Sequence, residues 1–83
     1  MTEQNLKSWP EFFEQTLSNF KDFEIRKNDR GYNVGDILLL REWDPEWGHY
    51  TGRWVKRRVT YMWDLSGLAP GLLGWVAMKL AVV

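Results

Sequence analysis

The sequence predicts a small, mainly β domain, a barrel of about five strands with one helix packed at an end. Three observations lead to this fold class. The chain has 83 residues, enough for one small domain spanning residues 1–83. Several segments alternate apolar and polar residues with period two, as half-buried strands do. A single segment near the amino end has helical spacing, and a small barrel plugged by that helix would bury every apolar face.

The predicted helix follows Ser8. The run Ser8-Trp9-Pro10-Glu11 matches a capping box, with serine at the N-cap, glutamate three residues later and proline early in the first turn. We expect the helix to end near Asn19, because asparagine tolerates the left-handed conformation that often terminates a helix. One stripe of this helix is expected to face the core, and it holds Trp9, Phe12 or Phe13, Thr16 or Leu17, and Phe20.

Strands are expected at residues 6–7, 23–27 and 37–43. In residues 23–27, Phe23 and Ile25 share one side. Their neighbours Glu24 and Arg26 share the other side. Residues 37–43 are a nearly unbroken apolar run, which is typical of a central strand covered on both faces.

The longest predicted strand covers residues 53–63 and is followed by a terminal strand after Gly74. Arg57 falls on the apolar face of the long strand, so it lies at an open barrel end or a bulge shifts the register there. The apolar face of the long strand holds Val55, Val59, Tyr61 and Trp63; that of the terminal strand holds Val76, Met78, Leu80 and Val82. We expect the core tryptophans to be Trp9, Trp63 and Trp75, whereas Trp47 and Trp54 face outward.

The composition excludes several classes of protein. The chain has no cysteine, which rules out disulfides and thiolate metal sites. Its single histidine, His49, lacks the carboxylate cluster of a metal site and the partners of a catalytic triad. We therefore expect no metal and no cofactor. The amino end has no targeting segment, and Gly and Pro interrupt the weakly charged stretch 65–83, so we expect a cytoplasmic protein without a membrane span.

A charged run at residues 21–30 is the first candidate site. Lys21, Glu24, Arg26 and Arg30 lie where the predicted helix ends and a strand begins. A guanidinium there could hold a phosphate or a base edge, while a carboxylate could accept from an exocyclic amine. The alternative is a solvated strand edge with charges paired across the sheet.

A second candidate is the basic segment with Arg53, Lys56 and Arg58, interleaved with Trp54 and Tyr61. Cations and aromatic rings on one face could track a phosphate backbone while bases stack. The same residues could simply protect an exposed strand from aggregation. The formal net charge of zero does not exclude nucleic acid, because it is a cancellation: residues 1–51 hold six basic and ten acidic residues, whereas residues 52–83 hold five basic residues and one acidic residue.

The runs Lys21-x-x-Glu24-x-Arg26, Asn28-Asp29-Arg30 and Val34-Gly35-Asp36-Ile37 resemble the ASCH domain of the PUA-like superfamily. Residues 9–62 are most similar to a small uncharacterised bacterial and phage branch of that family. The resemblance implies a PUA-type β-barrel and a partner that is RNA or a modified nucleoside.

Some ASCH relatives are amidohydrolases that deacylate a modified cytidine. By resemblance, Lys21 would then be the catalytic lysine and Glu24 would occupy the position of a catalytic threonine. That threonine is absent here, and so is the later acidic segment, which disfavours catalysis. A third alternative is a protein-interaction module that uses the aromatic loop 43–50, with Trp47 facing the partner.

Overall fold

The computed structural model describes residues 2–83, and these form one mixed five-stranded sheet in the order β1-β3-β4-β5-β2. Among the strands of this described range, only β1 and β3 pair in parallel. The mainly β fold with one helix is therefore confirmed. Its elements are β1 (Glu3–Ser8), α1 (Pro10–Leu17), β2 (Phe23–Lys27), β3 (Ile37–Asp44), β4 (His49–Asp64), the 3-10 helix η1 (Pro70–Leu72) and β5 (Trp75–Val82).

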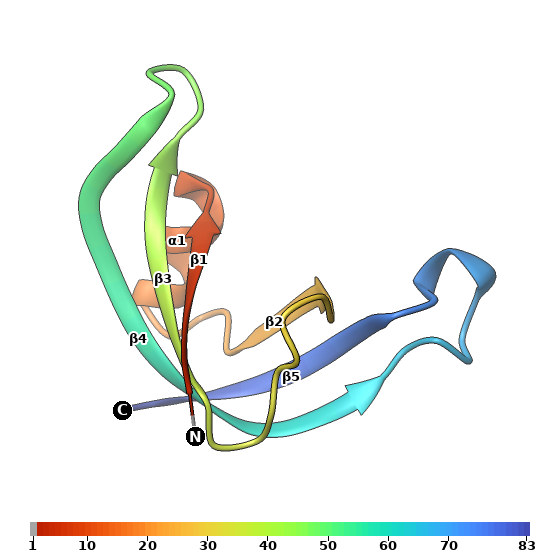
Figure 1. Ribbon diagram of the computed structural model, residues 1–83. Coiled ribbons are helices and arrows are strands. Elements are labelled where there is room, and N and C mark those ends of the chain that lie inside the picture. The colour runs from red at the N-terminus through yellow and green to blue at the C-terminus, as the bar shows by residue number, and fades with distance from the viewer. Residues whose placement is uncertain (1) are drawn as a thin grey trace.

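The sheet curls into a half-barrel, and the long bent strand β4 can be followed through the curl in Figure 1. Its two edge strands, β1 and β2, are joined by arginine side chains of β2 and of the loop after it, instead of by a backbone ladder. Arg26 donates to the carbonyl of Lys7 at 2.7 Å, and Arg30 donates to the carbonyl of Asn5 at 2.7 Å. We call this junction the arginine seam.

The core lies on the inner face of the curled sheet, beneath α1. Apolar side chains from all strands except β2 contribute to it, because alternate positions of each strand point inward. Val82, at the end of β5, was expected in the core and is exposed instead. The core cluster consists of Leu6, Phe13, Tyr32, Leu38, Leu40, Val55, Val59, Val76, Met78 and Leu80.

The start of the helix differs from the prediction, whereas its end agrees. Ser8 is not the N-cap: it extends β1, pairs with Glu42 of β3 and is buried. Trp9 occupies the cap position without a side-chain hydrogen bond. Parallel pairing with β3 thus outweighs the local capping motif. At the other end Asn19 has φ 63°, the left-handed conformation expected of it.

Fewer helical side chains are buried in the core than the sequence predicts. Only Phe13 and Thr16 of α1 are buried, because an eight-residue helix on a strongly curled sheet contacts it along a narrow line. Trp9 and Phe20 were expected in the core and are exposed instead.

Strand β2 alternates as predicted, but its inward face is the opposite one. Glu24 is 5% exposed, whereas Phe23 and Ile25 are about half exposed, at 46% and 51%. The reason is the position of β2 at the edge of the half-barrel, where the inward face lines an opening rather than the packed core. Strand β3, expected to be covered on both faces, is buried on one face through Leu38 and Leu40 and only half covered on the other.

The register shift in β4 lies three residues after Arg57, the position at which the sequence suggests a bulge. Arg57 is buried on the inner face, as its place in the alternation predicts. The shift falls between Val59 and Tyr61, so the prediction that Tyr61 and Trp63 share the core face is wrong. Both are at least half exposed.

The weakly charged stretch 65–83 forms the β4–β5 connection and strand β5. Within residues 2–83, no helix is long and apolar enough to cross a lipid bilayer.

Candidate functional site

A pocket of about 480 Å³ opens between β1, β2 and the start of α1. All four residues predicted from the charged run, Lys21, Glu24, Arg26 and Arg30, line it. The structure therefore brings these four side chains together on one concave surface. Whether a ligand binds them stays a prediction.

The chain reaches the pocket through the turn after α1. The backbone N–H groups of Phe20 and Lys21 both donate to the carbonyl of Gln15 at 2.9 Å, which ties the turn to the helix. The left-handed Asn19 reverses the chain direction there. Strand β2 then begins at Phe23, so Lys21 lies beside the inward-facing positions of that strand.

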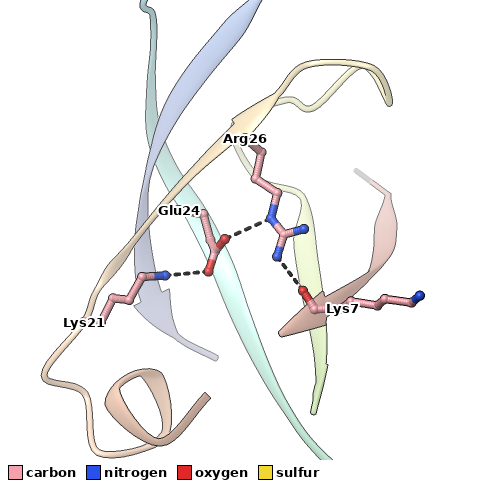
Figure 2. Close-up of polar contacts among 4 residues, drawn as sticks. All are labelled: Lys7, Lys21, Glu24 and Arg26. Atoms are coloured by element: carbon pink, nitrogen blue, oxygen red, sulfur yellow. Dashed lines mark hydrogen bonds and ion pairs between the residues drawn. The ribbon is translucent and has the colours of Figure 1, made fainter. Parts of the chain in front are cut away.

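Glu24 is the centre of the polar cluster shown in Figure 2. Its Oε1 accepts from Lys21 Nζ at 2.7 Å, and its Oε2 accepts from Arg26 Nε at 2.9 Å. The carboxylate side chain is 6% exposed, while those of Lys21 and Arg26 are 15% and 27% exposed. One nearly buried carboxylate thus holds two cations that reach the pocket surface.

Arg26 and Arg30 each have donors beyond those that form the arginine seam. Arg26 uses Nε for Glu24 and one Nη2 hydrogen for the carbonyl of Lys7, two of the five N–H groups of a guanidinium. In Figure 2 the Lys7 side chain extends away from this contact, so only its backbone takes part. The guanidinium is therefore fixed in position and still has N–H groups for a ligand.

Tyr32 is a pocket residue that the sequence did not indicate. It is 4% exposed, and its backbone N–H donates to Asn28 Oδ1 at 3.0 Å. Burial raises the pKa of its phenol, and the nearby charges of Arg26 and Arg30 oppose that rise. The phenol therefore lies within the field of both guanidinium groups. Its only sequence signal is an aromatic residue directly after the Asn28–Gly31 turn.

Aromatic rings surround the charged floor of the pocket. Lys21 Nζ lies 5.2 Å from the ring centre of Phe23 and 5.9 Å from that of Phe12. The rings of Trp9 and Trp75 also line the opening. A polar floor with an aromatic rim suits a flat, polar-edged ligand.

The second predicted group, Arg53, Lys56 and Arg58, does not share one face. Arg53 lies on the inner side, 4.9 Å from the Phe13 ring centre, and its Nη1 bonds Glu14 at 2.6 Å. That hydrogen bond raises the pKa of Arg53. Lys56 and Arg58 are on the outer side, and Lys56 forms an ion pair with Glu3 at 3.1 Å. Alternation within β4 separates Arg53 from the other two, which corrects the predicted grouping.

The aromatic loop 43–50 is a hairpin tip. Trp47 is 74% exposed, as predicted, and its ring centre lies 5.4 Å from that of His49. His49 is exposed, with Nδ1 2.8 Å from the carbonyl of Tyr50. In the described part of the chain, no group of three or more His, Cys, Asp or Glu residues is placed to hold a metal ion.

Fold and site together define a small, mainly β protein with a charged, aromatic-rimmed pocket. The chain belongs to the family described as "Domain of unknown function (DUF3850)", whose model matches residues 4–78. It is also 43% identical over 61 residues to an "Uncharacterized 12.9 kDa protein in GpA 3'region" of Escherichia phage P2. The match covers 74% of this chain and 54% of the phage protein, so the chain spans about half of that relative's length. The predicted likeness to an uncharacterised family with phage members is confirmed.

Proposed function

We propose that the pocket binds a nucleoside-like ligand, either free or as one nucleotide of an RNA. The observation that supports this best is the pairing of the Glu24 carboxylate with the Arg26 guanidinium inside an aromatic-rimmed pocket. The resemblance of residues 21–37 to ASCH domains of the PUA-like superfamily points to the same class of ligand.

The chemistry of the pocket suits a nucleobase. A base presents donors and acceptors along its edge, which an acceptor such as Glu24 and a donor such as Arg26 can recognise together. Its flat face can stack on an aromatic ring, and Phe12 and Phe23 lie at the pocket rim. The ammonium of Lys21 and the guanidinium of Arg30 add positive charge suited to a phosphate.

The test is calorimetric titration with the four common nucleosides, their monophosphates and a short single-stranded RNA. Arg26→Gln should weaken binding at least about tenfold, the loss of one charge-assisted hydrogen bond. Arg53→Gln is the matched control, because Arg53 also pairs with a glutamate but lies outside the pocket. Circular dichroism checks that both variants fold, and Lys21→Met replaces Arg26→Gln if the latter does not.

Failure of every nucleoside, monophosphate and RNA to bind the folded wild-type protein would overturn the proposal. So would equal weakening by Arg26→Gln and Arg53→Gln, because the pocket would then have no special role.

The amidohydrolase alternative has one observation in its favour, the 2.7 Å contact between Lys21 and Glu24. A lysine nucleophile has to present a free amine to its substrate, however, and here Lys21 Nζ donates to the Glu24 carboxylate. Asp64, the sole carboxylate after residue 46, does not line the pocket. Release of free cytidine from an acylated cytidine, abolished by Lys21→Ala, would favour the enzyme over the binding module.

The protein-interaction alternative is favoured by the exposure of Trp47 at the hairpin tip. A partner captured by the wild-type protein after nuclease treatment, and lost with Trp47→Ala, would support it.

A further inference from the structure

The bulge in β4 moves two aromatic side chains from the inner face of the sheet to the outer face. Val59 pairs with Leu80, and the next paired residue, Tyr61, is opposite Lys79, which leaves Thr60 as the extra residue. Without this insertion Tyr61 would point inward beside Val59, because side chains alternate along a strand. With it, Met62 takes the inward place and packs against the core.

Cross-strand pairing then places the outward residues in two rows across β4, β5 and β2. In the first row, Lys79 lies between Tyr61 and Phe23. In the second, Ala77 lies between Trp63 and Ile25. Neighbouring strands are about 4.8 Å apart, so the members of a row are in reach of one another. We call these two rows the outer platform.

The outer platform exposes flat rings. Tyr61 is 57% exposed, Trp63 50% and Phe23 46%. The ring centres of Tyr61 and Trp63 are 5.6 Å apart, at 49° to each other. A groove of about 290 Å³ runs between Phe23, Trp63 and Lys79. Three large rings beside a groove form a surface on which planar groups can stack.

The charge of this face is positive. The outward positions of β4 and β5 include Lys79, Arg58 and Lys56, of which Lys56 pairs with Glu3 of β1 at 3.1 Å, and the outward positions of β2, β4 and β5 include no aspartate or glutamate. Asp22, in the turn before β2, is the acidic residue at the groove. Aromatic rings interleaved with cations are what single-stranded nucleic acids bind, bases on the rings and phosphates beside the cations.

We propose that the outer platform is a second binding site that stacks successive bases of a single-stranded RNA. A second copy of this chain fits less well, since a twofold dimer through the same face would bury Lys79 of both copies where Asp22 is the acidic residue at the groove. A largely apolar protein partner would take the ammonium of Lys79, in the middle of the first row, out of water without supplying a charge of its own to pair with it.

The outer platform is continuous with the pocket. Phe23 and Ile25 line both the groove and the pocket, because β2 is the edge strand between them. A strand of RNA that stacks on Trp63 and Tyr61 can therefore pass over β2 and place one nucleotide in the pocket. This extends the proposed function, on which it rests, from a nucleoside to a single-stranded RNA segment.

The test is fluorescence anisotropy with a labelled single-stranded RNA of about twelve nucleotides, at several salt concentrations. Trp63→Ala and Tyr61→Ala should each weaken RNA binding about 5- to 100-fold, the range for losing one stacked base. Lys79→Gln should lower the slope of log affinity against log salt by about 0.7, as for one lost phosphate contact. Trp47→Ala is the control, an exposed tryptophan at the hairpin tip away from these rows.

The two proposals fail in different ways. Unchanged RNA affinity in Trp63→Ala and Tyr61→Ala overturns the outer platform, even if nucleosides still bind the pocket. RNA binding that depends on Trp63 but not on Arg26 supports the outer platform and counts against the pocket. Equal losses in Trp63→Ala and Trp47→Ala would indicate unspecific contact with aromatic surface and would also overturn it.

Discussion

Neutralising the Glu24 carboxylate tests whether burial gives the pocket ion pairs their strength. Glu24→Gln keeps the size of the side chain but removes the charge that faces Lys21 and Arg26. Breaking a fully buried ion pair lowers the free energy of unfolding by about 3–5 kcal/mol. Because the two cations here are partly exposed, we expect Glu24→Gln to lower it by about 2–3 kcal/mol. For a domain of this size, that lowers Tm by about 10–20 °C.

Glu14→Gln is the matched control. The Glu14–Arg53 contact is as short, 2.6 Å, but its side chains are 58% and 47% exposed. Exposed pairs are worth about 0.5 kcal/mol, so we expect Tm to fall by only about 2–4 °C. Urea and thermal unfolding are followed by circular dichroism at low salt and at about 0.5 M salt, which should abolish the Glu14 effect alone. Equal shifts in the two variants would refute the argument from burial.

Three further predictions concern stability. Burial raises the pKa of Tyr32, so its contribution to the free energy of unfolding is complete below the ordinary tyrosine pKa and is lost as the pH rises through the raised value. Tyr32→Phe should flatten the fall in urea midpoint above about pH 10, and an unchanged fall would contradict this. Because Asn19 has φ 63°, Asn19→Val should lower the free energy of unfolding in urea by about 1–2 kcal/mol, whereas Asn19→Gly should leave it unchanged. Similar losses in the two variants would contradict this. Arg57 donates to the carbonyl of Thr16 at 2.9 Å, so Arg57→Met should lower the free energy of unfolding in urea by about 1–3 kcal/mol. A variant more stable than the wild type would show that the core prefers an apolar residue at this position.

The sequence was informative where local chemistry decides the structure. Period-two alternation located the main strands, and the tolerance of asparagine for positive φ located the end of α1. The same alternation put Glu24 and Arg26 on one side of β2, which is why the pocket residues could be grouped before the fold was known.

What the sequence could not indicate depends on long-range geometry. Alternation does not say which face of a strand is inward, and β2 lines a pocket mouth, where the polar face points in. The bulge at Thr60 has no glycine or proline to mark it, so the sequence does not indicate that the Trp63 side chain points outward. The capping motif predicts Ser8 at the start of the helix, because pairing with β3, more than thirty residues later, cannot be read from a local motif.

The arginine seam also covers backbone groups that could otherwise pair with a strand of another molecule. In a strand, carbonyls two residues apart point to the same side, so those of Asn5 and Lys7 mark the edge of β1 that β3 does not use. Unpaired edges of this kind recruit strands from other molecules and start aggregates. Here two guanidinium groups occupy those carbonyls and place positive charge along the edge. The arginines that we assign to the pocket therefore also cover the edge of β1 to which a strand of another molecule would have to add.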